Sequence, residues 1–365
     1  MTKAYMILDL QFGSTGKGLL AGYLANIRKP DVCVTAWGPN AGHTYIDDQG
    51  NEYIHRMLAN GIVSPRLKSV LIGPGSVIDL DALTDEIFQS RHLLVGKRLV
   101  IHPAAVVVTA EHRERELRNV KIGSTMKGTG AAVVDRILRD PLNNPTASHA
   151  IPIAFLDRIT QMGIGIEVSA ESYDAAVKTA ELIQIEGAQG YSLSMYHGFY
   201  PYTTSRDVTP AQVMADCALP LSLSPQICGT LRTFPIRVSD RYDEDGNMIG
   251  TSGPCYPDQI ELSWGDVGVE PERTTVTKLP RRIFDFSFSQ LEEAVYRCAP
   301  TKLFLNFANY LPKKEVAELI DRINKAVPNN CRVEWIGEGP THSDVFIYPE
   351  WNFIYSQEQE QGESE

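Results

Sequence analysis

The chain has 365 residues, 43% of them hydrophobic, which is enough for one large α/β domain or two smaller ones. Its formal net charge of −11 argues against nonspecific binding to nucleic acid or to an anionic membrane surface, although local basic residues can still serve an anionic ligand. We therefore expect neither nucleic acid nor a membrane among the partners of this chain.

The cysteines and the apolar runs indicate a protein of the cytoplasm. The six cysteines form no C-x-x-C pair and therefore predict reduced thiols, with neither a zinc site nor a disulfide framework. The apolar run at residues 4–10 is only about seven residues long and lacks a cleavage pattern, so it predicts a strand and not a signal peptide. No uncharged apolar run approaches the roughly 20 residues that a membrane span requires.

Taken in chain order, short apolar runs alternate with amphipathic segments. Strands are predicted at residues 4–10, 32–37, 69–72, 98–101, 182–185, 226–234, 302–307 and 332–336. Helices are predicted at residues 17–27, 80–89, 110–118, 131–139, 172–181, 209–217, 289–297 and 313–326. This alternation favours an α/β fold whose central sheet is mostly parallel and is flanked by helices.

Turn and cap signals add detail to this outline. Residues 47–51 and 243–247 are typical of hairpin turns, so we expect small hairpin insertions. Ser289 with Glu292 fits a capping box, and Pro312 suits the first turn of a helix.

No internal repeat or clean linker divides the chain, so residues 1–350 are predicted to form a single domain. Residues 141–152 are predicted to be a loop. The last stretch, residues 357–365, is acidic and polar, which is typical of a disordered tail.

A glycine-rich turn, G-S-T-G-K-G at residues 13–18, follows the first predicted strand. Its glycines let backbone N–H groups turn towards an anion, the helix that follows adds its positive dipole, and Lys17 supplies a full charge. The spacing is not that of a Walker A motif, which requires G-x-x-x-x-G-K-[ST]. Taken alone, the turn is as consistent with a tight connection between a strand and a helix as with a phosphate site.

Four further stretches strengthen the phosphate interpretation. They are N-A-G-H-T at residues 40–44, I-G-S-T-M-K-G-T-G at 122–130, E-G-A-Q-G at 186–190 and Y-P-Y-T-T-S at 200–205. Together with the first turn, and in this order, they resemble the adenylosuccinate synthetase family from residue 6 to about residue 340. The resemblance implies the fold of that family, which is similar to the fold of P-loop NTPases. It also implies one site beyond the carboxyl ends of the strands.

The resemblance implies a reaction as well. In this family the γ-phosphate of a nucleoside triphosphate activates the 6-oxo group of a purine nucleotide, and the amine of aspartate then displaces that phosphate. Such phosphoryl transfer needs positioning and charge neutralisation more than covalent help. Lys17 would hold the phosphates, His43 would act as a general acid, and Ser14 and Gln189 would complete the catalytic set. Mg²⁺ would be the cofactor, with Ser14 and the Gly42 carbonyl as ligands.

Three binding groups follow from the same resemblance. The residues expected at the nucleoside monophosphate are Ser14, Asn40, Ser124, Thr125, Arg139, Gln189 and Thr204. Those expected at the triphosphate are Gly13, Thr15, Gly16, Lys17, Gly18, Gly42, His43, Thr44, Asn306, Asn309, Gly337 and Gly339. L-Aspartate would be held by Val276, Thr277 and Arg281, because an arginine fork suits carboxylates. Arg139 would reach the nucleotide of a neighbouring subunit, which implies a homodimer.

Single residues in these groups also have ordinary structural explanations. Lys17 could be a solvated lysine at a helix start, His43 a structural histidine, and Arg139 a solvated arginine at a helix end. The five stretches together favour the functional interpretation. Between residues 231 and 274 the usual segment of the family is not recognisable, and no role is assigned there.

Departures from the family pattern point to the substrates. Ser14 stands where family members carry an aspartate that takes the N1 proton of IMP, and Thr15 replaces the glutamate after it. Leu279 replaces an arginine on the ribose side, and Asn309 matches an aspartate that reads the guanine of GTP. These changes resemble the bacteriophage branch of the family, which takes dGMP in place of IMP.

The expected reaction is therefore the ligation of L-aspartate to C6 of dGMP, with hydrolysis of ATP or dATP and a 6-phosphoryl intermediate. The products would be N6-succino-2-amino-2'-deoxyadenylate, ADP and phosphate. Two alternatives stay open: an ordinary adenylosuccinate synthetase that acts on IMP, and a non-catalytic nucleotide-binding relative. The absence of an aspartate at position 14 counts against the first. Retention of Lys17, His43, Gln189 and Arg281 argues against the second.

Overall fold

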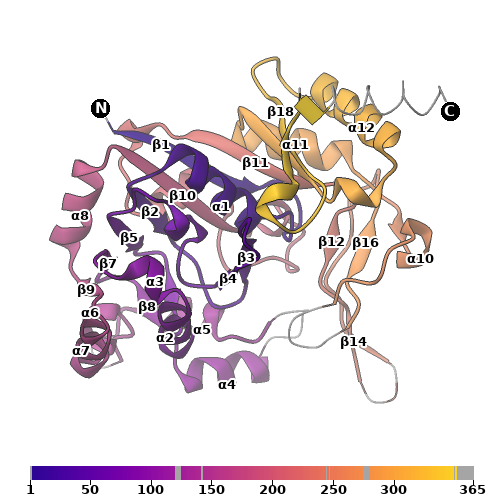
Figure 1. The fold of residues 1–365 in the computed structure, drawn as a ribbon. Coiled ribbons are helices and arrows are strands. Elements are labelled where there is room, and N and C mark those ends of the chain that lie inside the picture. Colours follow the sequence, from indigo (N-terminus) through magenta and orange to yellow (C-terminus); the bar gives the residue numbers. More distant parts are fainter. Residues whose placement is uncertain are drawn as a thin grey trace.

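The computed structural model describes residues 2–119, 125–140, 143–243, 245, 247–273, 279–348, 350 and 351. Through the centre of this part runs a ten-stranded sheet in the order β19-β18-β17-β11-β1-β10-β2-β5-β7-β9 (Figure 1). Its strands are β1 (Lys3–Asp9), β2 (Val32–Thr35), β5 (Ser69–Ile72), β7 (Arg98–Ile101), β9 (Gly165–Val168), β10 (Leu182–Gly190), β11 (Gln226–Arg232), β17 (Lys302–Asn306), β18 (Arg332–Gly337) and β19 (Val345–Ile347). Only β18 and β19 pair antiparallel, so the predicted α/β class with a mostly parallel sheet is confirmed.

Helices cover both faces of this sheet. They are α1 (Lys17–Arg28), α2 (Leu80–Gln89), α3 (Arg91–Leu94), α4 (Ala110–Asn119), α5 (Thr129–Leu138), α6 (Ala147–Ala150), α7 (Ile153–Gln161), α8 (Ala170–Thr179), α9 (Pro210–Asp216), α10 (Trp264–Val267), α11 (Phe288–Cys298) and α12 (Lys313–Ala326). The two layers follow from the alternation of side chains along buried strands. Tyr5 and Ile7 of β1 share an apolar cluster with Leu20 of α1. Met6 and Leu8 belong to the cluster that includes α8, α9, α11 and α12.

Four smaller sheets lie beside the large one. They are β12 (Ile236–Arg237) with β16 (Arg282–Phe284) and β15 (Glu261–Leu262), β13 (Arg241–Tyr242) with β14 (Met248–Gly250), β3 (His43–Ile46) with β4 (Glu52–His55), and β6 (Val77–Ile78) with β8 (Val106–Val107). Figure 1 shows β12, β16, α10 and the hairpin of β14 on one side of the molecule, away from α2, α7 and α8.

The two predicted hairpins are confirmed. Strands β3 and β4 pair antiparallel around residues 47–51, where the Asp47 carboxylate accepts from the N–H groups of Gln49 and Asn51 at 3.0 and 2.8 Å. Strands β13 and β14 pair antiparallel around the second predicted turn.

The predicted capping box of Ser289 and Glu292 is wrong. Helix α11 begins at Phe288, one residue before Ser289, and its cap is Ser287, whose hydroxyl accepts from the N–H of Gln290 at 2.9 Å. The N–H of Ser289 instead donates to the Asp258 carboxylate at 3.0 Å, a partner distant in sequence.

Other expectations about the elements also need correction. The predicted loop at residues 141–152 contains the short helix α6, and the sequence analysis missed helix α7 and the edge strand β9 that follow it. Strand β10 continues to Gly190, so the stretch at residues 186–190 is part of a strand and does not follow one. Helix α5 begins at Thr129, two residues earlier than predicted.

No helix in the described ranges is long and apolar enough to cross a membrane. The tail predicted at residues 357–365 lies outside the described residues.

A steric test of the packing of α1 is the substitution Gly22→Ala. A Cβ atom at Gly22 would lie 2.2 Å from the ring of Tyr45, and the hydroxyl of that ring is held by the Asn26 amide at 2.9 Å. We expect the overpacking to lower the free energy of unfolding by about 1–3 kcal/mol, measured by urea denaturation. The control Gly165→Ala, whose nearest atom is 3.4 Å away, should change stability much less. Equal effects of the two substitutions would contradict this view of the helix contact.

Candidate active site

The glycine-rich turn is organised by one buried carboxylate, that of Asp9 at the carboxyl end of β1. Asp9 accepts from the N–H groups of Gln11 at 2.9 Å, Gly13 at 3.2 Å and Thr15 at 3.4 Å. It also accepts from the Thr15 hydroxyl at 2.5 Å. The turn is thereby folded back over the end of the strand before the helix begins.

Lys17 is buried in the first turn of α1 and pairs with the same carboxylate. Its Nζ atom lies 3.1 Å from Asp9 Oδ2 and donates to the carbonyl of Gln189 at 2.9 Å. Gln189 has a left-handed backbone with φ of 63°, and it belongs to the stretch at residues 186–190. The structure therefore brings the first and fourth stretches together around one ammonium group.

Ser14 occupies the tip of the turn. Its backbone is left-handed, with φ of 57°, and its side chain is exposed. Its main-chain carbonyl accepts a hydrogen bond from the guanidinium of Arg232 at 3.1 Å. A hydroxyl at this position is therefore open to a ligand while its main chain is fixed.

Thr15 and Asn306 support the turn from inside the protein. The hydroxyl of Thr15 is fully buried and shared between Asp9 and Thr230, so its predicted place at the triphosphate stays a prediction. The Asn306 amide donates to the Thr15 carbonyl at 3.4 Å. A Cβ atom at Gly16, where φ is 88°, would lie 2.0 Å from that amide, so this approach requires glycine.

His43 begins strand β3 beside the turn. Its ring lies edge-on to Trp37 at a centroid distance of 4.1 Å, and its buried Nδ1 atom has no partner among the described residues. Burial first, and then the charge of Lys17, hold the pKa of His43 well below its usual value. The histidine is therefore neutral at pH 7 before a ligand binds, and an incoming anion would favour its protonated form.

Two buried glutamates hold the hairpin that carries His43. Glu186 accepts from the N–H groups of Asn60 at 3.0 Å and Gly61 at 2.8 Å, and the Asn60 amide donates to the His43 carbonyl at 3.3 Å. Glu86 accepts from three N–H groups at residues 56–58. Burial raises the pKa of both glutamates to about 7 despite these hydrogen bonds.

The second and third stretches meet at the start of α5. A Cβ atom at Gly38 would lie 3.0 Å from the Thr129 side chain and 3.2 Å from Asn40 Oδ1, so these side chains are neighbours. The hydroxyl of Thr129 is buried and has no partner among the described residues. The Glu116 carboxylate holds the N–H groups of Gly128 and Gly130 at 2.7 and 2.6 Å. Thr125 precedes this turn and is half-buried, whereas Ser124 lies outside the described residues.

The fifth stretch joins the same edge. The side chain of Ser205 lies near Gly130, and the N–H of Thr204 donates to the Leu193 carbonyl at 2.7 Å. Arg139 directly follows α5 with a left-handed backbone and an exposed side chain, at the opposite end of the helix from Gly128. Its predicted place at the monophosphate of a neighbouring subunit stays a prediction.

The segment expected to bind aspartate is described only in part. Val276 and Thr277 lie outside the described residues. Arg281 is half-buried near Glu272 and Arg232, and this burial lowers the pKa of its guanidinium. The main-chain N–H of Arg281 donates to the main-chain carbonyl of Glu272 at 2.8 Å, so these two residues are in contact although nine positions separate them.

The residues expected at the donor base follow β17 and β18. Asn309 is exposed in the single turn at Ala308–Tyr310. A Cβ atom at Gly337 would lie 2.2 Å from Asn306 Oδ1, so the ends of β17 and β18 are in close contact. Gly339 is half-buried next to the Asp344 carboxylate.

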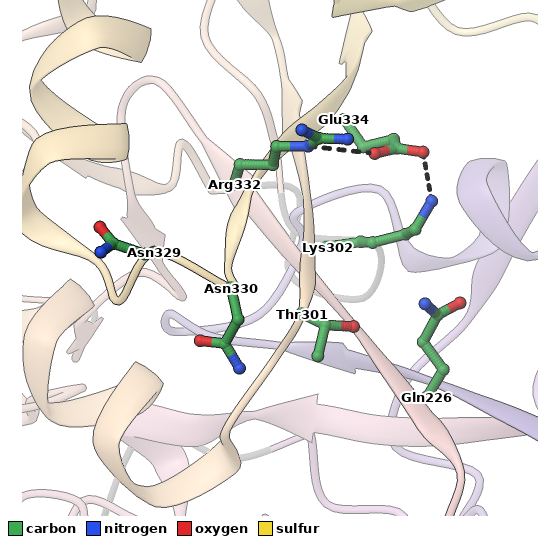
Figure 2. Close-up of a pocket in the computed structure, with 7 residues that line it drawn as sticks. All are labelled: Gln226, Thr301, Lys302, Asn329, Asn330, Arg332 and Glu334. Carbon is green, nitrogen blue, oxygen red and sulfur yellow. Dashed lines mark hydrogen bonds and ion pairs between the residues drawn. The ribbon is translucent and has the colours of Figure 1, made fainter.

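A separate hollow of about 270 Å³ lies at the opposite edge of the sheet, where β11, β17 and β18 begin (Figure 2). Its charged side chains pair with one another, because Glu334 faces both Lys302 and Arg332. Ligands of open α/β sheets bind at the carboxyl ends of the strands. We therefore take the loops that follow β1, β2, β10 and β17 as the candidate active site.

Sequence reasoning missed three charged residues that build this site. Asp9, Glu186 and Arg232 are all buried, with exposed fractions of 1%, 3% and 0%. Asp9 and Arg232 end strands β1 and β11, whereas Glu186 lies within β10. An acidic residue inside the apolar run that precedes the glycine-rich turn was a signal for Asp9. Arg232 had no such signal, because its partners are far away in the sequence.

Comparison with known proteins identifies the family. The family model of adenylosuccinate synthetase matches residues 6–149 and 153–316, and the chain belongs to this family of C–N ligases. The chain is 46% identical to the N6-succino-2-amino-2'-deoxyadenylate synthase of Acinetobacter phage SH-Ab 15497, over 96% of each chain. It is 48% identical to the synthase of the same name from Salmonella phage PMBT28, over 94% of this chain and 97% of the relative.

A solved structure agrees with these relatives. It is the succinoaminodeoxyadenylate synthetase of cyanophage S-2L bound to dGMP and to dATP as an energy donor. The two chains are 40% identical and superpose with a TM-score of 0.85, over 98% of this chain and 99% of that one.

The buried histidine behind His43 provides a test by pH. His55 pairs with His43 across the hairpin and bonds to Asn60 and Ser90, and burial lowers its pKa to about 4. The unfolded chain protonates this histidine near pH 6.5, so its contribution to stability is lost as the pH falls from about 6.5 to about 4. The loss is about 3 kcal/mol.

The variant His55→Gln should therefore lose about 3 kcal/mol less stability than the wild type over this pH range, measured by urea denaturation at each pH. Glu86 and Glu186 titrate in both proteins, so the difference between the two curves isolates His55. Parallel curves would show that the histidine is not held neutral.

Proposed function

We propose that the protein is a ligase that joins L-aspartate to C6 of dGMP and uses ATP or dATP as the phosphoryl donor. The products are N6-succino-2-amino-2'-deoxyadenylate, the nucleoside diphosphate and phosphate. The names of the two phage relatives and the dGMP and dATP in the cyanophage structure support this substrate pair. In this chain, the observation that carries the proposal is Ser14, an exposed and uncharged residue at the tip of the cradle.

The chemistry follows from the charges around the cradle. The O6 atom of dGMP attacks the γ-phosphorus of the donor, the diphosphate leaves, and the purine loses its N1 proton. The aspartate amine then attacks C6 and phosphate leaves. Lys17 neutralises phosphate charge, and His43, protonated once the anion is bound, donates to the transferring phosphoryl oxygen or to O6.

Mg²⁺ fits the oxygen atoms exposed at this edge. The Ser14 hydroxyl and the Gly42 carbonyl belong to exposed residues, and Mg²⁺ in such sites needs only one or two protein oxygens besides phosphates and water. When bound, the ion would neutralise charge on the phosphates.

Ser14 suits a purine that carries a 2-amino group. A serine is shorter than the aspartate of the enzymes that act on IMP, so it leaves room beside C2. Its hydroxyl accepts from N1–H or from the amino group. The exchange gives up a carboxylate base, so the N1 proton leaves through Ser14 to water or to a phosphate oxygen.

The donor and the sugar are proposed from two further positions. Asn309 is exposed after β17, and its amide offers both an acceptor and a donor to adenine, whereas an aspartate would suit guanine. Leu279 offers no hydrogen bond to a 2'-hydroxyl, so a buried hydroxyl there would lose its water partners. We therefore propose preferences for an adenine donor and for a deoxyribose.

Arg281, with Val276 and Thr277, is proposed to hold L-aspartate. Its guanidinium is a fork that matches a carboxylate, and its burial near Glu272 limits competition from water.

We also propose a homodimer in which Arg139 reaches the nucleotide of the neighbouring subunit. Apolar side chains are exposed on the helix that precedes it, namely Val134, Ile137 and Leu138 of α5. An apolar patch of this kind beside an exposed arginine supports a protein interface. The six cysteines are free thiols, which supports the cytoplasm of a host cell as the compartment.

Steady-state turnover with aspartate, ATP and each of dGMP, GMP and IMP tests the substrate proposal. We expect the highest kcat/KM with dGMP, and a lower rate when GTP replaces ATP at subsaturating donor. The variant Ser14→Asp should lose dGMP turnover and shift the ratio towards IMP by one or two decades, since a charged pair is worth about 1–3 kcal/mol.

Ser14→Ala is the matched control, because it removes the hydroxyl without adding charge and should keep the preference for dGMP. A wild-type preference for IMP would overturn the substrate proposal. An unchanged ratio in a folded Ser14→Asp variant would remove Ser14 from the specificity argument, and faster turnover with GTP would overturn the donor preference.

Subunit mixing tests the role of Arg139. Arg139→Ala and Lys17→Ala should each be inactive, but a hybrid dimer would contain one intact site. An equal mixture should recover about a quarter of wild-type activity after subunit exchange. If mass spectrometry confirms hybrid dimers and activity stays absent, Arg139 does not act across the interface.

A further inference from the structure

Arg232, at the carboxyl end of β11, is a fully buried arginine that touches three segments of the candidate active site. Its Nη1 atom donates to the Ser14 carbonyl at 3.1 Å. Its Nη2 atom pairs with the Glu272 carboxylate, and Nη1 lies 3.4 Å from the other oxygen of that group. The guanidinium also stacks on Phe307, with its carbon 3.8 Å from the ring centroid.

The main chain of Arg232 is locked to the glycine-rich turn as well. Its N–H donates to the Gln11 side chain at 2.9 Å, and the Gln11 amide donates back to its carbonyl at 3.2 Å. Both groups are buried. The arginine therefore has little freedom relative to the turn that carries Ser14.

Glu272 connects this arginine to the other substrates. Its main-chain carbonyl accepts from the N–H of Arg281, and its carboxylate accepts from the Tyr310 hydroxyl at 3.0 Å. Tyr310 directly follows Asn309. Glu272 thus links the segment proposed for aspartate, through its main-chain carbonyl, to the turn proposed for the donor base, through its carboxylate.

The energetics indicate that this pair is not simply a source of stability. Removing an arginine from water costs several kcal/mol, and a buried ion pair often stabilises a fold no more than apolar residues of the same volume would. The Nε atom of Arg232 is also buried without a partner among the described residues, which adds to the cost. What the pair supplies that apolar residues could not is a directional link between the loops.

We propose that Arg232 and Glu272 form a positioning pair that couples the nucleotide cradle to the aspartate-binding segment and fixes Ser14 at its tip. The identity of the substrates in this inference rests on the proposed function. The pair acts through Ser14 and Arg281 and does not touch the reacting atoms.

The variant Glu272→Gln tests the coupling, because it keeps the shape of the side chain and removes its charge. We expect the Kd of aspartate, measured by calorimetry on enzyme saturated with dGMP and a nonhydrolysable ATP analogue, to rise about tenfold, as the loss of about 1.4 kcal/mol would produce. In turnover the KM of aspartate should rise more than kcat falls. Arg232→Lys keeps the charge but cannot bridge both partners, and should give the same split.

Glu261→Gln is the matched control. The Glu261 carboxylate accepts two hydrogen bonds from the guanidinium of Arg282, within the small sheet of β15 and β16. This pair involves neither the glycine-rich turn nor Glu272. It should leave the affinity for aspartate unchanged. If the pair served only to stabilise the fold, Arg232→Lys and Glu272→Gln would each contain a smaller fraction of active protein, but the Kd of aspartate would be unchanged. That result would overturn the proposal.

The binding measurement separates this inference from the proposed function. If the wild type turns over IMP and not dGMP, the substrate proposal fails, and the aspartate affinity is then measured with IMP. If the wild type turns over dGMP and Glu272→Gln binds aspartate as the wild type does, the positioning pair fails while the proposed function stands.

Discussion

The active-site edge depends on the contact between the Asp9 carboxylate and the turn that follows it. A loop that aims N–H groups and an ammonium at an anion is unfavourable without one, because its donors repel each other. Asp9 takes three N–H groups, the Thr15 hydroxyl and Lys17, and so holds the cradle in shape before a nucleotide arrives. The turn and the Lys17 ammonium are therefore in place before a phosphate group binds, which reduces the reorganisation needed for phosphoryl transfer.

Buried carboxylates also hold the main chain around His43, the residue that we propose as the general acid. Glu86 and Glu186 accept hydrogen bonds from five N–H groups of the segment after β4. The side-chain amide of Asn60, in that segment, donates to the His43 carbonyl. Burial raises the pKa of both carboxyls to about 7, which shows how strongly water is excluded there. The histidine is therefore placed by buried groups that take no part in the reaction.

The residues that we propose to select the substrates are therefore different from the buried residues that hold the site together. Ser14 and Asn309, which we connect with the choice of purine and donor, have exposed side chains at the tips of loops. Asp9, Glu186 and Arg232 lie beneath them, buried and bonded to main chain. A substitution at a tip can change the substrate without removing a hydrogen bond on which the fold depends, whereas a substitution in the buried set alters every loop at once.

The sequence by itself determined the alternating strands and helices, the family, and the stretches that carry Lys17, His43 and Gln189, because apolar periodicity and glycine turns are local signals. Only the tertiary structure decided which buried charges hold those stretches. The Ser14 carbonyl and Arg232 are 218 residues apart, and the N–H of Asn60 and Glu186 are 126 apart. It also decided that α11 begins at Phe288 after the cap Ser287 and that β9 is an edge strand, because a distant aspartate and an already formed sheet select those ends. Such pairings have no local pattern, since they exist only once the parallel strands have brought their carboxyl ends to one edge.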